Sequence, residues 1–174
     1  MDGGEAVVIF SSFLKLTGEI AVTAPLRLTD VVNRRADFLE VRNVSLEPLA
    51  STYPVVSHVE TSALVAKASI VFVAPVHEAP LETGRRSALL VEKVIRRVAV
   101  STDAFSLVCE VFLEPRLGLR ETIERNLDDF IPVRNLSAVW VPALTREPVS
   151  IQRPFALLQP RRILSFAERE DVVT

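Results

Sequence analysis

Alternating polar and apolar positions dominate this chain and predict short β-strands. Ala6 to Phe13 is a β-branched and aromatic run. In the following stretch to Thr23, the positions alternate, with Leu16, Gly18, Ile20 and Val22 set against Lys15, Thr17, Glu19 and Ala21. Pro25, which has no N–H to give to a sheet, ends this pattern. A helical period replaces it at Leu28, where Asp30 favours the first turn of a short helix. Further strands are predicted over residues 38–46, 55–59 and 62–76.

The same order of patterns returns about 91 residues later. Phe38-Leu-Glu-Val-Arg-Asn-Val-Ser45 matches Phe130-Ile-Pro-Val-Arg-Asn-Leu-Ser137 at five of eight positions. Strand patterns over residues 89–102 and 105–113 precede a second helix at 119–126, and 14–46 aligns with 105–138 at eleven identities. A repeat of this length indicates two copies of one small module.

The repeat therefore predicts a mainly β protein with two similar antiparallel modules. Each would be a small barrel or curled sheet with one short helix between its second and third strands, because curling hides strand edges. We expect the first module over residues 1–83 and the second over 84–174. The connector is expected at about 75–88, with the boundary near Gly84. The alternation does not reveal whether the two modules share one continuous sheet.

Composition restricts the environment and the partners. No apolar run is long enough to cross a bilayer and no leader opens the chain, so we expect a cytoplasmic protein without a membrane partner. Residues 1–87 carry eight basic and ten acidic side chains, and residues 88–174 carry twelve of each. Without a basic excess, nucleic acid is a possible but less favoured partner.

The one polar pair present in both copies is the candidate binding site. Arg42-Asn43 and Arg134-Asn135 could hold an anion, since arginine offers a planar fork and asparagine both donates and accepts. The structural alternative is that asparagine occupies a bulge while arginine covers an apolar flank. The pattern favours this structural role.

Groups for catalysis or metal binding are sparse. His58 and His77 have no second ligand at a useful spacing, and a single cysteine, Cys109, inside an alternating strand is expected to be a buried filler. Asp128-Asp129 is expected in a solvated turn. We therefore predict no catalytic residue, no metal, no cofactor and no enzymatic activity.

The first copy contains Phe13-Leu-Lys-Leu-Thr-Gly-Glu-Ile-Ala-Val22, Leu28-Thr-Asp-Val-Val-Asn33, Phe38-Leu-Glu-Val-Arg-Asn-Val44 and Lys67-Ala-Ser-Ile-Val-Phe-Val-Ala-Pro75. The glycine-containing strand, the helix and the aromatic strand, in this order, resemble a bacterial family of small all-β modules that itself has no established activity. The resemblance is looser in the second copy, where Arg120 to Glu124 replaces the helix motif. It implies a fold and no mechanism.

Two weaker resemblances imply a nucleotide ligand. Leu16-Thr-Gly-Glu-Ile20 and Asp30-x-x-Asn33 resemble Sm-like barrels, which bind uridine-rich RNA through an Arg/Lys-Gly pair; here Lys67 is followed by Ala68. Asn43-Val-Ser45 resembles part of a motif of PilZ-type barrels, which bind cyclic di-GMP, although Pro48 replaces its glycine.

Duplicated cores without duplicated reactive groups predict a non-enzymatic binding or scaffold protein. Its partner would be another protein or a second copy of itself. The alternative is an Sm-like or PilZ-like nucleotide- or RNA-binding protein.

Overall fold

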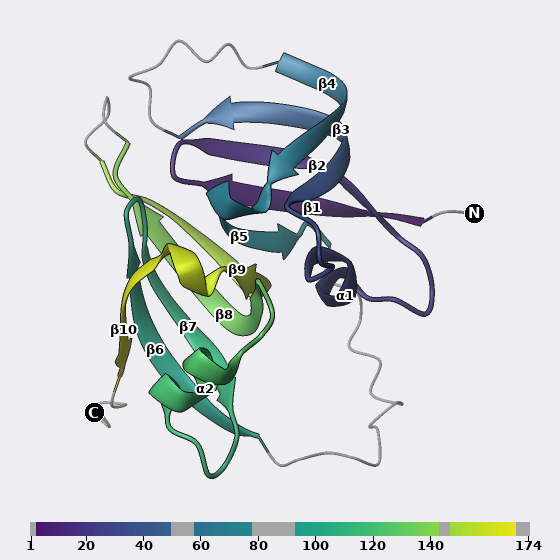
Figure 1. Ribbon diagram of the computed structural model, residues 1–174. Helices are drawn as coiled ribbons and strands as arrows, with labels where there is room; N and C mark the ends of the chain where they lie inside the picture. Colours follow the sequence, from purple (N-terminus) through teal and green to yellow (C-terminus); the bar gives the residue numbers. More distant parts are fainter. Residues whose placement is uncertain (1–2, 50–57, 78–92, 143–146, 170–174) are drawn as a thin grey trace.

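Ten antiparallel strands form one sheet in the computed structural model, which describes residues 3–49, 58–77, 93–142 and 147–169 (Figure 1). The strands follow the order β10-β6-β7-β8-β9-β5-β1-β2-β3-β4, and the sheet does not close, so β10 and β4 are its two edges. The prediction of a mainly β antiparallel protein is confirmed. The sheet is also continuous through both halves, which the sequence did not reveal.

The N-terminal half supplies five strands, one short helix and one 3₁₀ turn. In chain order these are β1 (Gly3–Ser11), β2 (Leu14–Val22), α1 (Leu28–Val32), β3 (Phe38–Pro48), β4 (His58–Ala66), η1 (Lys67–Ser69) and β5 (Ile70–Pro75).

The C-terminal half repeats this succession of elements. It consists of β6 (Val94–Thr102), β7 (Ser106–Leu113), α2 (Leu119–Arg125), β8 (Ile131–Trp140), β9 (Val149–Leu158), η2 (Pro160–Arg162) and β10 (Ile163–Glu168). Both helices begin at the predicted residues. Asp30 accepts a hydrogen bond from the Arg27 N–H at 2.8 Å, and Glu121 accepts one from the Gly118 N–H at 3.3 Å.

Within each half the strands have the same spatial order: fifth, first, second, third, fourth. The halves meet where the fourth strand of the second, β9, pairs with the fifth strand of the first, β5. That ladder is short and pairs Phe72 with Leu158 and Val73 with Leu157. We call this contact the junction. In Figure 1 it lies between the two halves, with β4 and β10 on the far sides.

Two details add to or differ from the sequence-based expectations, and a third lies outside the described residues. Residues 62–76 are not one strand: β4 ends at Ala66, η1 follows, and β5 starts at Ile70. Gly3 to Glu5, which precede the predicted strand run from Ala6, already pair with β2. The predicted boundary near Gly84 lies outside the described residues, as do Val55 to Ser57 of the expected strand 55–59.

The buried side chains of the two halves interpenetrate at the junction. Phe130 and Leu157, from the second half, are fully buried in a cluster formed otherwise by first-half residues such as Ile9. Conversely, Phe10 and Phe72 stack at 4.5 Å inside the second-half cluster. Because each core is completed by the other half, the junction is part of the fold and not a loose interdomain contact.

Candidate functional site

The predicted Arg-Asn pairs lie at matching bulges of the sheet. Opposite β2 the register of β3 shifts beside Asn43, and opposite β7 the register of β8 shifts beside Asn135. Both asparagines have positive φ, 51° and 48°. Asparagine tolerates this left-handed conformation better than most residues with a side chain. The bulge that the structural alternative requires is therefore present in both halves.

The residue facing each bulge has little room. A Cβ added to Gly18 would lie 2.6 Å from Val41 Cγ1 and 2.7 Å from the Arg42 carbonyl oxygen. Glycine is needed there because the backbone of β3 approaches closely. In the second half Cys109 faces the bulge, and its side chain is 1 % exposed. Burial, reinforced by the charge of Glu110, raises the pKa of this thiol from 9.0 to about 12. Cys109 is thus a buried filler, as predicted, and not an activated nucleophile.

The two pairs do not form one site. In the sheet, β9, β5, β1 and β2 separate β3 from β8. Arg42, Asn43, Arg134 and Asn135 are all exposed. Glu19 lies opposite Arg42 in register, and Arg42 makes an ion pair with Glu40 on its own strand at 3.6 Å.

Substitution of Asn43 separates the structural role from a binding role. Asn43→Ala should lower the free energy of unfolding by about 1 kcal/mol because alanine has a Cβ and no compensating side-chain hydrogen bond at φ 51°. Asn43→Gly should be nearly neutral, since glycine adopts this conformation freely. Urea unfolding of the two variants measures the difference. Equal losses for alanine and glycine would mean that the amide group, and not the backbone, is what the position requires.

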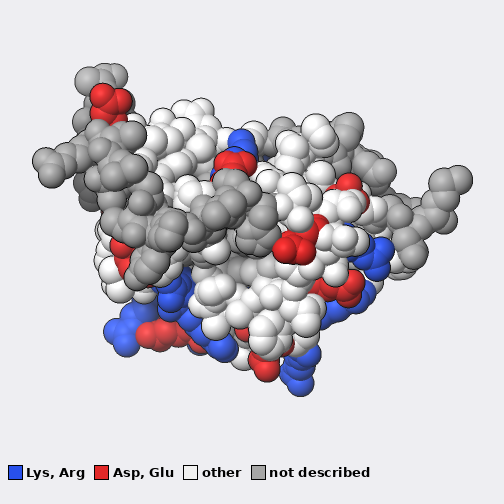
Figure 2. Space-filling view, turned by 90° about the horizontal axis from the view of Figure 1, so that it is seen from above, with Lys and Arg blue, Asp and Glu red and all other residues white. Residues whose placement is uncertain are grey.

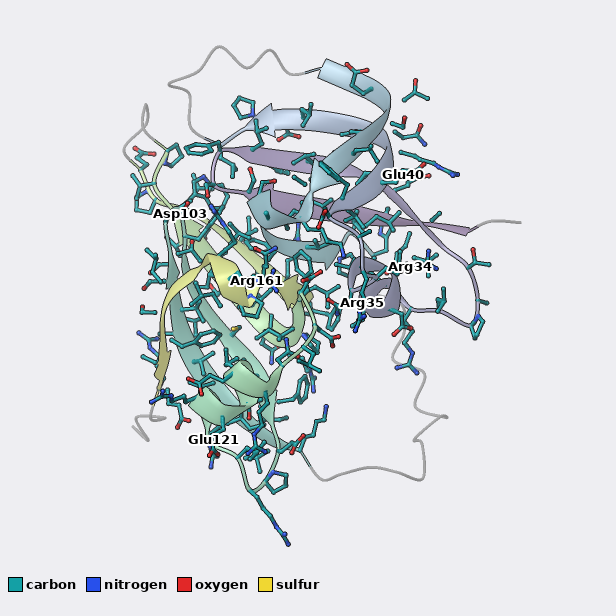
Figure 3. All side chains as sticks on the ribbon, viewed as in Figure 1. Arg34, Arg35, Glu40, Asp103, Glu121 and Arg161 are labelled. Carbon is teal, nitrogen blue, oxygen red and sulfur yellow. The ribbon has the colours of Figure 1, made fainter. Side chains whose placement is uncertain are left out.

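A surface cavity of about 210 Å³ lies beside Arg42. Three cations, one carboxylate and an aromatic ring contribute to its lining: Arg34, Arg42, Lys67, Glu40 and Phe38. A second hollow of about 460 Å³ lies near Trp140 and Arg153. In Figure 3, Arg34 and Arg35 lie beside α1, and Glu40 lies above them on the same side of the view.

Charges of both signs are mixed on the surface. Figure 2, which views the molecule from above, shows acidic and basic side chains next to one another along one rim and mostly uncharged atoms across the centre. This agrees with the balanced composition of the two halves.

Asn33, at the end of α1, forms hydrogen bonds between the two halves at the junction. Its side chain donates to the Phe130 carbonyl oxygen at 3.0 Å and accepts from the Phe130 N–H at 2.8 Å. The motif Asp30-x-x-Asn33, which resembled a nucleotide-binding turn, thus has a structural use here. In the second half Glu124 lies at the corresponding position.

A buried lysine adds a second polar contact at the junction. Lys67 is 4 % exposed and donates to the Arg34 carbonyl oxygen, and its Nζ lies 3.4 Å from Asp129 Oδ2. The amide of Gln159 donates to the Lys67 carbonyl oxygen at 2.5 Å. Asp129, expected in a solvated turn, is thereby a partner of a buried cation. Hydrogen bonds and an opposite charge offset the desolvation of that cation.

A third polar contact between the two halves involves the 3₁₀ turn η2. Arg162 on η2 donates to Ser12 at 2.6 Å and to Asp103 at 2.7 Å, while Ser12 donates to Asp103 at 2.7 Å. Figure 3 shows Asp103 at the left of the view and Arg161 of the same 3₁₀ turn near the middle of the molecule. The halves are therefore joined by polar contacts as well as by apolar packing.

The two open edges carry apolar side chains in water. Phe38 at the start of β3 is 54 % exposed, and Leu64 on the edge strand β4 is 70 % exposed. On the other edge strand, β10, Leu164 is 74 % exposed. The alternation around these residues is that of an ordinary strand, so the sequence alone does not predict that they are exposed.

The corresponding positions at the junction are fully buried. Phe130 aligns with Phe38, Leu157 lies three residues before η2 as Leu64 lies three before η1, and Val71 is the second residue of β5 as Leu164 is of β10. Each of the three junction residues, Phe130, Leu157 and Val71, is 0 % exposed. Phe38, Leu64 and Leu164 are therefore exposed at positions whose counterparts in the other half are buried.

Neither the described side chains nor the comparisons with known proteins assign a chemistry to the chain. Within residues 3–49, 58–77, 93–142 and 147–169, no group of three or more His, Cys, Asp or Glu side chains is arranged to hold a metal ion. Across the described part of the chain, no helix combines the length and apolar character that spanning a membrane requires. Comparison with protein families, curated proteins and solved structures gave no match.

Proposed function

We propose that this protein is a non-enzymatic scaffold of two similar β modules that binds another polypeptide through its open sheet edges. The observation that carries the proposal is the difference in exposure between matched positions. Leu64 is 70 % exposed, whereas Leu157 is 0 % exposed at the junction. An edge strand offers unpaired backbone groups, and an added strand satisfies them while its side chains cover apolar surface.

Matching strand pairings support the tandem-module part of the proposal. Between β1 and β5 the register shifts beside Ser11, and between β6 and β10 it shifts beside Ile163, the position that corresponds to Ile70. The bulges beside Asn43 and Asn135 match in the same way. Each module has one fourth-strand edge and one fifth-strand edge, and the junction occupies one of each, so the edges β4 and β10 are left for an outside partner.

The proposal is tested by altering both edges at once. A tagged full-length chain and the double variant Leu64→Lys, Leu164→Lys are analysed by light scattering after gel filtration and by retention of proteins from the source cell. The wild-type chain should exceed its monomer mass of 19.3 kDa or retain a protein, and the double variant should do neither. A wild-type chain that stays monomeric and retains nothing beyond what the variant retains would contradict the proposal.

A further inference from the structure

We infer that the occupant of the β4 edge is the β10 edge of a second copy of this chain, joined head to tail as β9 is joined to β5. This inference rests on the proposed use of the open edges and names their partner. Each chain carries one β4 edge and one β10 edge. They correspond to β9 and β5, the two strands that already pair inside the molecule.

The internal ladder specifies the register between copies. At the junction Leu158 pairs with Phe72 and Leu157 with Val73. The corresponding strands run antiparallel to their neighbours in the same way, so Val65 of one copy should face Ser165 of the next, and Leu64 should face Phe166. Leu64 would then leave water beside an aromatic side chain that is itself half-buried.

The second half has apolar residues where the contact between copies would form, at the positions that correspond to apolar residues of the junction. At the junction Leu157 packs in the cluster that contains Ile9 and Val73, which are paired with each other across β1 and β5. The corresponding pair across β6 and β10 is Val100 and Phe166. Phe38 and Leu64 of a neighbouring copy would therefore extend an apolar cluster, as Phe130 and Leu157 do within the chain.

The contact between copies should be weaker than the junction. In the second half, Ser101 and Ser165 occupy the positions of Phe10 and Phe72, so the stacked aromatic pair of the junction would not be repeated between copies. At the corresponding positions of the second half, Glu124 takes the place of Asn33, which hydrogen-bonds across the junction, and Pro160 takes the place of the buried Lys67. The assembly should therefore be reversible. Apolar packing and backbone pairing would hold the copies together without the side-chain hydrogen bonds that join the two halves of one chain.

Head-to-tail contacts have a geometric consequence. Because the two contacting surfaces differ, each added copy leaves one free edge of each kind. Repetition gives a closed ring if the rotation between copies closes, and an open filament if it does not. A symmetric dimer made by two β4 edges would instead leave both β10 edges free.

Single-edge variants test the inference. Leu64→Glu alters the β4 edge alone and Leu164→Glu the β10 edge alone; both side chains are exposed, so each variant should fold with the thermal midpoint of a wild-type monomer. In sedimentation-velocity experiments the wild-type chain should assemble and each variant alone should be monomeric. An equal mixture should form a species of twice the monomer mass, because the intact β10 edge of one variant can bind the intact β4 edge of the other.

Val59→Glu is the matched control. Val59 lies on the same strand and is 77 % exposed, but its counterpart Gln152 is exposed rather than buried. This variant should assemble like the wild-type chain. A wild-type chain that remains monomeric up to millimolar concentration overturns the inference, as does assembly unaffected by Leu164→Glu or a variant mixture that stays monomeric. If the wild-type chain is monomeric yet retains another protein that the double-edge variant loses, the proposed function stands and only the identity of the partner is wrong.

Discussion

Phe130→Ala should lower the free energy of unfolding by about 3–5 kcal/mol, whereas Phe38→Ala should lower it by less than about 1 kcal/mol in the dissociated chain. The two phenylalanines align in the repeat, but Phe130 is 0 % exposed and Phe38 is 54 % exposed. Truncating Phe130 removes apolar contacts at the junction and leaves a cavity inside the first-half core. Urea unfolding at protein concentrations low enough to prevent assembly measures both values.

The same pair of variants also tests whether Phe38 contributes to the contact between copies. Phe38→Ala should weaken assembly at concentrations where the wild-type chain is assembled, although its stability as a monomer barely changes. Phe38→Leu, which keeps an apolar side chain, serves as the conservative control and should retain more of the assembly. Equal losses of stability for Phe38→Ala and Phe130→Ala would mean that Phe38 is packed within its own chain and that the edge is not open there.

Local patterns were sufficient to predict most secondary structure. Alternation over 14–23 and 105–113 produced strands, and the helical period from Leu28 and Leu119 produced helices. The repeat located asparagines at corresponding places, and both proved to sit at bulges, because the left-handed conformation at Asn43 and Asn135 is a local demand of the backbone.

The junction could not be predicted in the same way. Its ladder joins Phe72 to Leu158 over two pairs, far apart in the sequence, and no alternation encodes which edge strand meets which. The 3₁₀ turn η1 was also missed, since Lys67-Ala-Ser69 interrupts two strands without a glycine or proline. Its role depends on Asp129 and Gln159 of the other half.

Exposure at the edges was equally hidden from the sequence. Phe38 and Phe130 begin segments that match at five of eight positions, so the local sequence does not separate an exposed ring from a fully buried one. The difference arises because the second half meets the first through one pair of edges and leaves the other pair open. The repeat therefore predicts which residues of the two halves correspond. Only the fold shows which member of each pair is buried at the junction and which is exposed at an edge.

Alkaline pH should destabilise the folded chain through Cys109. Burial holds the pKa of its thiol at about 12 in the folded state, against 9.0 for a solvated thiol. The protonated form is the one that the folded state favours, so this stabilisation is fully present below pH 9 and is lost as pH rises towards 12. Between these values the free energy of unfolding should fall by about 1.4 kcal/mol per pH unit from this group alone. Unfolding in urea at pH 8 and pH 10.5 measures the loss.

Cys109→Ala isolates this contribution from other groups that titrate at high pH. At pH 8 the variant should be less stable by about 1 kcal/mol because the sulfur no longer fills its site. At pH 10.5 it should match or exceed the wild-type chain, since alanine has no proton to lose there. Alanine is accommodated because the β8 backbone leaves room for the larger cysteine, unlike the β3 backbone at Gly18. Parallel stability curves for the two chains would show that the thiol ionises as easily in the folded state as in the unfolded one.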